Sequence, residues 1–132
     1  MIRTAIDSSI LFDVFIRHSE NFDSTASLIR QAIENGCLVV SDVVYAEVSA
    51  HFESHREFSD VFVDAEFIFE ALSEEACFLA GQIWKAYRSK GGKRDKMIPD
   101  FMVAAHAFKQ CDRLLTRDRG FYKTYFPKLK ML

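Results

Sequence analysis

Short apolar runs alternate with longer segments of helical periodicity along this chain. The runs at Ile2–Ile6, Cys37–Val40 and Arg113–Thr116 have the length of buried strands. Helices are predicted between them, because apolar side chains recur there every three or four positions. Parallel strands need helical crossover connections, so this order predicts an α/β domain with a central, mainly parallel sheet and helices on both faces, a three-layer α/β/α arrangement.

Residues 1–132 are expected to form one domain, because the length lies within the usual single-domain range. The stretch Asn21–Asp23 and the basic segment “KGGKRDKM” are predicted loops. The predicted elements in chain order are strand Ile2–Ile6, helix Ser8–Phe15, helix Ser24–Glu34, strand Cys37–Val40, a helix capped by Ser41 or Asp42, a helix over 53–66, strand Phe67–Leu72, a helix from Ser73 to about Lys90, a helix with Pro99 in its first turn that ends near Gln110, strand Arg113–Thr116 and a short strand Leu129–Leu132.

Four acidic residues occupy positions where a ligand site is expected. Asp7 follows the first strand, and Asp118 lies just beyond the strand that contains Leu114 and Leu115. Ligand sites in open α/β sheets lie at the carboxyl ends of the strands. The other two acids, at positions 47 and 100, fall in predicted helices, on faces that their spacing directs toward the core. The sequence therefore predicts that four carboxylates converge.

Asp100 precedes an apolar helical stripe, and an acid in such a place requires a partner. The stripe consists of Val103, Ala104, Ala107, Phe108 and Cys111. Two carboxylates ~4 Å apart repel by about 4 kcal/mol at an effective dielectric of ~20, so a cluster takes up protons or binds a cation. Oxygen ligands without His or Cys favour Mg²⁺ or Mn²⁺, which can activate water at a phosphodiester. Each acid alone could instead cap a helix or form a salt bridge, but the placement of all four favours a metal site.

Four segments, in this order, resemble the PIN-domain family of metal-dependent ribonucleases, and most of all the VapC-type toxins of VapBC toxin–antitoxin pairs. They are “AIDSSIL” near the start, “SDVVYAEV” at 41–48, “IPDFMVAAHA” at 98–107 and “LLTRDRGF” at 114–121. The resemblance implies that Asp7, Glu47, Asp100 and Asp118 form the catalytic metal-binding cluster. It also implies RNA cleavage, a homodimer and a cognate antitoxin. Where the family often has Asn two positions after its first Asp, this chain has Ser9, which can still form a hydrogen bond.

Charge is divided between the two parts of the chain. Residues 1–84 hold 4 Lys or Arg against 15 Asp or Glu, whereas residues 85–132 hold 13 against 4. A basic second part suggests a surface for a polyanion, although a solvated face is an equally good explanation of the charge alone. The candidate substrate-binding residues are Ser9, Lys93, Arg94, Lys96, Thr116 and Arg117. The basic ones would contact RNA phosphates, and the two hydroxyls would orient water or a carboxylate.

Two other classes of function compete with a nuclease as explanations of Asp7 and the other acids. A phosphatase of the haloacid dehalogenase type would use Asp7 as its nucleophile, but that family has a second Asp two residues later, where this chain has Ser9. A non-enzymatic PIN-like interaction module would usually have lost acids, and this chain keeps all four.

The cysteines and the apolar runs indicate a cytoplasmic protein. Cys37, Cys77 and Cys111 are widely spaced in apolar surroundings, which predicts reduced core thiols rather than a disulfide framework or a CxxC metal site. No apolar run approaches the roughly 18–20 residues of a spanning helix, so no membrane association is expected.

Overall fold

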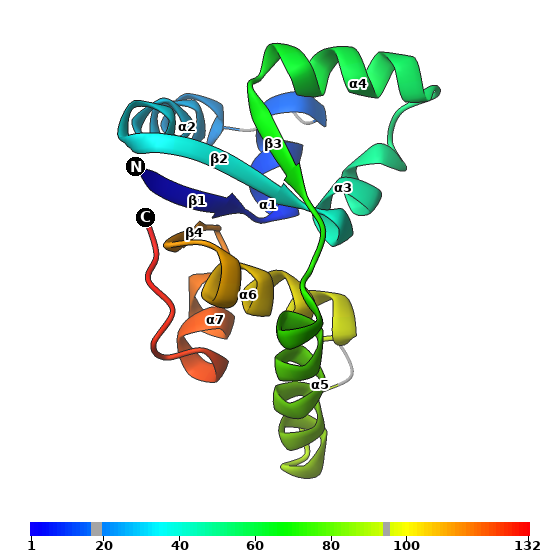
Figure 1. Cartoon of the computed structure of the whole chain (residues 1–132), viewed down its shortest axis with the longest axis vertical. Helices are drawn as coiled ribbons and strands as arrows, with labels where there is room; N and C mark the ends of the chain where they lie inside the picture. Colours follow the sequence, from blue (N-terminus) through cyan, green and yellow to red (C-terminus); the bar gives the residue numbers. More distant parts are fainter. Residues whose placement is uncertain (17–19, 94–95) are drawn as a thin grey trace.

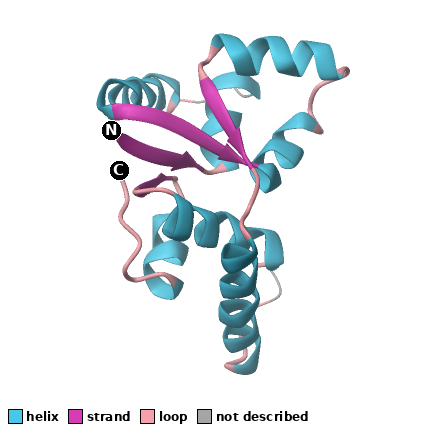
Figure 2. Cartoon of the chain, in the orientation of Figure 1, coloured by secondary structure: helices cyan, strands magenta, loops and turns pink. Residues whose placement is uncertain are grey.

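A parallel sheet forms the centre of the computed structural model, which describes residues 1–16, 20–93 and 96–132 (Figures 1 and 2). Its strands are β1 (Ile2–Ile6), β2 (Gly36–Ser41), β3 (Phe67–Glu70) and β4 (Arg113–Leu115). Their order is β3-β2-β1-β4, and each of the three strand pairs is parallel. The predicted α/β class with a mainly parallel sheet is therefore confirmed.

Helices cover both faces of this sheet. They are α1 (Ser8–Leu11), the π-helix η1 (Phe12–Ile16), α2 (Phe22–Asn35), α3 (Asp42–Ser49), α4 (His55–Asp64), α5 (Glu74–Ser89), α6 (Ile98–Gln110) and α7 (Arg119–Tyr125). On one face α2 packs against β1 and β2, and on the other α6 packs against β1 and β4 (Figure 1).

The strand order explains this division of the helices. From β1 through β2 to β3 the chain moves in one direction across the sheet, and it then returns to place β4 on the far side of β1. Crossovers between parallel strands are almost always right-handed, so opposite movements put their helices on opposite faces. The order also reverses between β1 and β4, and a crevice opens at such a reversal, beyond the carboxyl ends of the strands.

The centre of the sheet is mostly apolar, and one glycine allows its two inner strands to meet. Leu38, Val39 and Leu114 are completely buried. Gly36 begins β2 opposite Ile2, and a Cβ atom at Gly36 would lie 2.0 Å from the Ile2 carbonyl oxygen. A larger residue would therefore displace the start of β1, which leads directly to the site at Asp7.

Helix α3 begins at the predicted cap. The Ser41 Oγ accepts a hydrogen bond from the Val44 backbone N–H at 3.3 Å, and Ser41 itself is buried. Ser73 caps α5 in the same way, as predicted, by accepting from the Ala76 N–H. Because α3 carries Glu47, its N-terminal cap also sets the position of that acid.

We expect the substitution Ser41→Ala to lower the free energy of unfolding by about 1 kcal/mol, because the Val44 N–H then loses its partner at a buried helix start. Urea denaturation monitored by circular dichroism measures this change. Ser89→Ala, at an exposed position near the end of α5, is the matched control and should change stability by less than about 0.5 kcal/mol. Equal stabilities of the two variants would contradict the role assigned to this cap.

Several predicted boundaries and exposures are wrong. Helix α2 begins at Phe22 rather than after a loop, because the Thr25 N–H bonds to the Asn21 carbonyl oxygen and closes a turn there. The predicted final strand is reduced to one isolated bridge between Leu114 and Met131. Helix α7 was not anticipated. Cys77 is exposed on α5 rather than a core thiol.

Candidate active site

Asp7 lies at the reversal in strand order and is held by the end of β4 and by the start of α1. Its backbone N–H bonds to the carbonyl oxygen of Leu115, at the end of β4, at 3.0 Å. Its Oδ2 accepts hydrogen bonds from the Thr116 hydroxyl at 2.7 Å and from the Ser9 hydroxyl at 3.2 Å. The residue is only 8% exposed. Asp7 is thus fixed in position and direction before any ligand binds.

Thr116 connects Asp7 to Asp118, which follows β4 in the chain. The same hydroxyl that donates to Asp7 accepts a hydrogen bond from the backbone N–H of Asp118 at 3.0 Å. The Asp118 side chain is 46% exposed and forms an ion pair with Lys96, whose Nζ lies 2.5 Å from Oδ2. Asp118 therefore stands at the solvent side of the site, while Asp7 forms its floor.

Glu47 approaches Asp7 from helix α3. The Ser8 hydroxyl lies 3.5 Å from Oε2 of Glu47 and 3.5 Å from Oδ1 of Asp7, and so stands between the two carboxylates. Burial of the carboxyl group raises the pKa of Glu47 to about 7, with further contributions from the charges of Asp7 and Asp100. The residue as a whole is exposed, so the prediction that Glu47 points into the core is wrong. Its carboxyl group lies at the edge of the site, beside the Ser8 hydroxyl.

Asp100 enters the site from the first turn of α6, where Pro99 lies as predicted. Its Oδ2 accepts a hydrogen bond from the Met97 backbone N–H at 3.0 Å, which caps the helix. Partial burial raises the pKa of Asp100, and the charges of Asp7 and Asp118 act in the same direction. Asp100 therefore caps its helix, as the alternative to a metal site proposed, and its charge also interacts with those of Asp7 and Asp118.

Tyr122, from α7, is a buried side chain whose pKa responds to the charges of all four acids. It is 2% exposed. Burial raises its pKa, and the charges of Asp7, Asp100, Asp118 and Glu47 all add to this effect. One buried side chain is thus within electrostatic reach of all four. The sequence did not single out Tyr122, because nothing in its local pattern distinguishes it from a core aromatic.

The four carboxylates form an open arrangement, not a closed cage. In the described part of the chain, the one group of three or more His, Cys, Asp or Glu side chains with ligand atoms within 4.8 Å of one another lies elsewhere, at Glu70, His106 and Cys111. Oxygen donors of this kind fit a hard divalent ion such as Mg²⁺ or Mn²⁺, and a cation there would offset the charge repulsion that helps to raise the pKa values of Glu47 and Asp100.

The candidate substrate-binding residues divide into three groups. Ser9 and Thr116 both bond to Asp7, and Lys96 pairs with Asp118. Lys93 is exposed in the segment between α5 and α6, and Arg94 lies outside the described residues. Arg117 forms an ion pair with the buried carboxylate of Asp13.

Asp13 is a residue of this region that the sequence did not reveal. It lies in η1, is 1% exposed, and receives the Arg117 Nε at 2.7 Å and the Thr25 hydroxyl at 3.3 Å. The Arg117 backbone N–H also lies 3.5 Å from the Ser9 hydroxyl. Arg117 therefore fastens the segment between β4 and α7, which carries Asp118, to the elements after β1.

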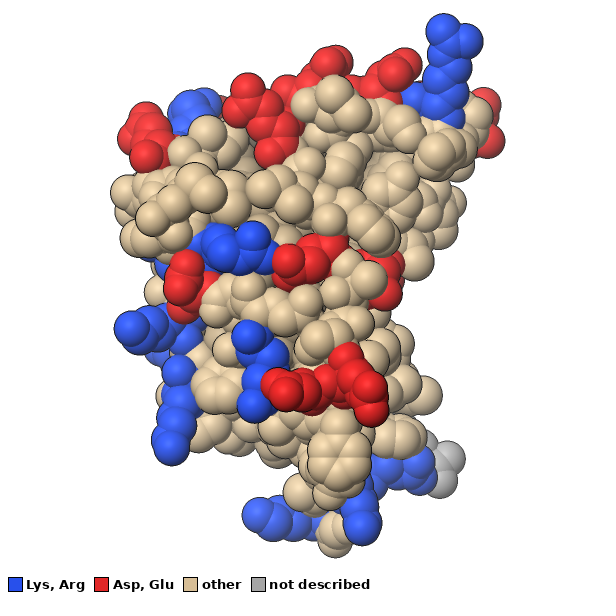
Figure 3. All heavy atoms as spheres, in the orientation of Figure 1, with Lys and Arg blue, Asp and Glu red and all other residues tan. Residues whose placement is uncertain are grey.

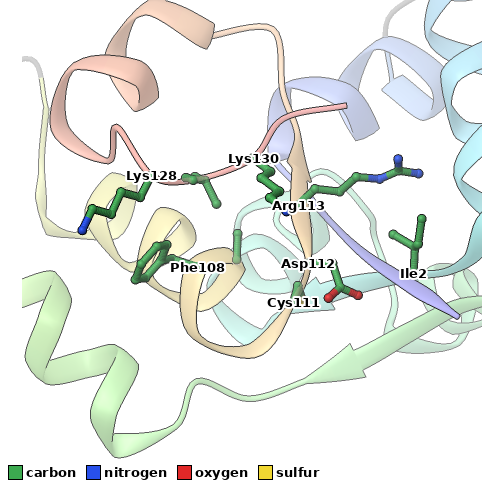
Figure 4. Close-up of a pocket in the computed structure, with 9 residues that line it drawn as sticks. Ile2, Phe108, Cys111, Asp112, Arg113, Lys128 and Lys130 are labelled. Carbon is green, nitrogen blue, oxygen red and sulfur yellow. The ribbon is translucent and has the colours of Figure 1, made fainter.

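The charges on the surface follow the division seen in the sequence. In Figure 3 acidic side chains gather along the upper edge, over α2 and α4, and basic ones gather over the lower part. One cavity of about 470 Å³ opens at the amino ends of β1 and β4, away from Asp7, and is lined by residues that include Ile2, Cys111, Arg113, Lys128 and Lys130 (Figure 4). It does not include any of the four acids.

Comparisons with known proteins agree with this fold. The PIN domain family model matches residues 4–127. Among solved structures, VapBC2 from Rickettsia felis bound to a promoter DNA fragment aligns with a TM-score of 0.76 at 20% identity, covering 99% of this chain and 98% of that chain. VapBC-1 from nontypeable Haemophilus influenzae aligns with a TM-score of 0.74 at 15% identity, covering 99% and 97%. DNA-bound VapBC from Salmonella typhimurium aligns with a TM-score of 0.63 at 17% identity, covering 100% and 98%. No curated protein sequence matches significantly.

Proposed function

The chain belongs to the PIN domain family, and from this premise we propose that it is a Mg²⁺- or Mn²⁺-dependent endoribonuclease, the VapC-type toxin of a toxin–antitoxin pair. The observation that carries the proposal is the place of Asp7 at the switch point of the sheet, with Asp118 and Glu47 linked to it through single hydroxyl groups, those of Thr116 and Ser8. Carboxylates gathered at that place are the ligands a hard cation needs for phosphodiester hydrolysis.

In this proposal three of the four acids have distinct parts, and Asp118 is paired with a lysine. A divalent ion held by the carboxylates would act as a Lewis acid that activates water and offsets charge on the phosphate oxygens. Asp7, held by two hydroxyls, is the fixed ligand, and Asp100 is oriented by its helix cap. Glu47 has a pKa of about 7 and can hold or release a proton near neutral pH, as a general base requires. Lys96 lies beside Asp118 and provides a cation for the substrate phosphate.

RNA cleavage in the presence and absence of metal tests this function. We expect purified protein to cleave RNA with Mg²⁺ or Mn²⁺ and to lose that activity in a chelator. Restored metal should restore the rate. Cleavage that continues unchanged in the chelator would contradict the metal mechanism. The phosphatase alternative predicts instead hydrolysis of a small phosphomonoester through a phosphorylated Asp7, so the same preparations should be assayed with such a substrate.

The binding partners of this chain are proposed by analogy with the similar solved structures. The three structures compared above are named as VapBC, and two of them are bound to DNA. We propose that this chain likewise pairs with a cognate antitoxin, forms a homodimer and acts in the cytoplasm, where its RNA substrate is found. In the described segments no helix is both long and apolar enough to cross a membrane. Expression alone should arrest growth, and co-expression of the antitoxin should relieve the arrest.

RNA binding is expected to depend on the loop between α5 and α6. Replacing Lys93, Arg94 and Lys96 together by Ala should weaken binding and flatten its salt dependence, because each lost phosphate contact reduces the slope of log K against log salt by about 0.7 for single strands. Fluorescence titrations over a range of salt concentrations, with metal replaced by Ca²⁺ to slow cleavage, measure the slope.

The control for this loop is a pair of lysines at the opposite end of the sheet. Lys128 and Lys130 are exposed and line the cavity near the amino end of β4. Their replacement by Ala should leave the slope unchanged. A larger effect from this pair than from the loop would place the RNA on the other end of the molecule.

A further inference from the structure

A second group of ligating side chains lies outside the proposed active site. A carboxylate oxygen of Glu70, a ring nitrogen of His106 and the Cys111 sulfur all lie within 4.8 Å of one another. They come from three places in the chain: the end of β3, the middle of α6 and the residue just after α6. We propose that these three side chains form a binding site for a borderline-soft divalent ion, Zn²⁺ or a close analogue, that fastens β3 to α6.

The chemistry of the donors favours zinc over the hard ions of the acidic site. A thiolate, an imidazole and a carboxylate are the three kinds of protein ligand that Zn²⁺ takes, and zinc sites with three protein ligands complete the tetrahedron with water. Thiolate and imidazole ligands disfavour Mg²⁺, which selects oxygen. This group and the four acids would therefore bind different ions.

The surroundings of the group hold its ligands in place. Glu70 binds Arg3 through Oε2, at 2.5 Å from Nη2, so Oε1 faces His106 at 3.0 Å and also receives the Gln110 side-chain N–H at 3.2 Å. Ligating carboxylates are commonly oriented by such outer hydrogen bonds. The Arg3 charge reduces the attraction for a cation, but the thiolate formed on binding adds a negative charge to the group.

Binding of the ion releases one proton. Coordination replaces the S–H bond of Cys111 with a metal–sulfur bond, and the proton leaves to solvent. His106 would coordinate the ion as a neutral imidazole, through a ring nitrogen that carries no proton.

An ion can reach this group from solvent. His106 is 1% exposed, but Cys111 is partly exposed and lines the cavity of about 470 Å³ at the amino ends of the strands (Figure 4). The cavity thus gives access to Cys111, whose sulfur lies within 4.8 Å of a ring nitrogen of the buried His106.

Titration of the metal-free protein with Co²⁺, a spectroscopic substitute for zinc, tests the proposal. We expect one equivalent to produce a thiolate-to-cobalt charge-transfer band, which a site made only of carboxylates cannot give. The band should disappear in Cys111→Ser. It should remain in Cys77→Ser, the matched control at an exposed cysteine, and in Asp7→Asn, which alters the acidic site. No band in the wild type, or a band that survives Cys111→Ser, would overturn the proposal.

A second measurement covers the case in which Cys111→Ser fails to fold. The wild-type protein is alkylated with and without Zn²⁺, and each cysteine is quantified by peptide mapping. Zinc should slow the labelling of Cys111 several-fold and leave Cys77 unaffected. Equal labelling of Cys111 in both samples would mean that Glu70, His106 and Cys111 form a hydrogen-bonded network without affinity for a metal. This outcome does not depend on ribonuclease activity.

Discussion

Asp7→Asn should lower the rate of metal-dependent RNA cleavage roughly 10²-fold or more, the scale on which the loss of one positioned catalytic group acts. Asp7 lies at the carboxyl ends of β1 and β4 and is the most buried of the four acids. The substitution removes its charge but keeps its shape. An Asn side-chain oxygen can still accept hydrogen bonds from Thr116 and Ser9, so the fold around it should remain intact.

The experiment needs a measurement that separates chemistry from folding. Initial cleavage rates at saturating Mg²⁺ or Mn²⁺ are compared with melting temperatures of the same preparations. Asp60→Asn, an exposed carboxylate on α4, is the matched control and should retain the wild-type rate. A wild-type rate in Asp7→Asn would remove the acidic cluster from catalysis. If the variant loses both activity and stability, the cleavage rate is measured again below its melting temperature, where the variant is folded.

Much of the fold could be predicted because its signals are local. The strands around Ala5, Val39 and Leu114 are short apolar runs, and the caps at Ser41 and Ser73 are hydroxyl residues directly before amphipathic segments. The ends of these strands are also local features, and they allowed the positions of Asp7 and Asp118 to be predicted. The alternation of strands and helices then predicts a parallel sheet, and the resemblance to PIN domains that followed is confirmed by the match to the family model.

The contacts that the sequence did not reveal join residues far apart in the chain. Asp13 meets Arg117 across 104 positions, and Glu70 meets His106 across 36. The local sequence around Asp13 and around Glu70 does not indicate which residue each contacts. Arg117 was predicted to contact RNA because it is basic and near Asp118, but in the structure its Nε is bound to a buried carboxylate. Such pairing depends on tertiary packing, which spacing alone does not determine.

Helical periodicity also has limits near the ends of helices. It predicted Phe108 on the buried stripe of α6, and this residue is 39% exposed, whereas His106 is buried between Ala105 and Ala107. The reason is that α6 is covered on more than one side. It packs on the sheet and also against α5, so its buried surface is wider than one stripe. A polar residue can then be buried wherever a partner such as Glu70 is within reach.

The second large effect concerns the stability of the metal-free protein. The carboxyl group of Glu47 has its pKa raised from 4.5 to about 7, by burial first and then by the charges of Asp7 and Asp100. Between these two values the folded state keeps a proton that the unfolded state has lost. The contribution of Glu47 to stability is therefore complete below about pH 4.5 and falls as pH rises through 7. A bound divalent ion should reverse the loss, because it binds the ionised carboxylates of the folded state alone.

Glu47→Gln is expected to make the metal-free protein more stable than the wild type at pH 8, by about 1 kcal/mol, since the exposed edge of the site is screened by water. At pH 4.5 the two should be nearly equal. Mg²⁺ or Mn²⁺ at about 100 times its dissociation constant should stabilise the wild type by ~2.7 kcal/mol. The gain should be smaller in the variant. Urea denaturation at both pH values, with chelator or metal, measures these differences.

The sign of the change is what makes this a test, because most substitutions destabilise a protein. Glu53→Gln, at an exposed position in the turn between α3 and α4, removes the same charge away from the site and should have little effect at either pH. If Glu47→Gln is less stable than the wild type at pH 8, and metal does not stabilise the wild type, the carboxylates do not repel one another in the folded state. The site would then consist of separately satisfied acids, and the cation at the centre of the proposed mechanism would have no ligands to hold it.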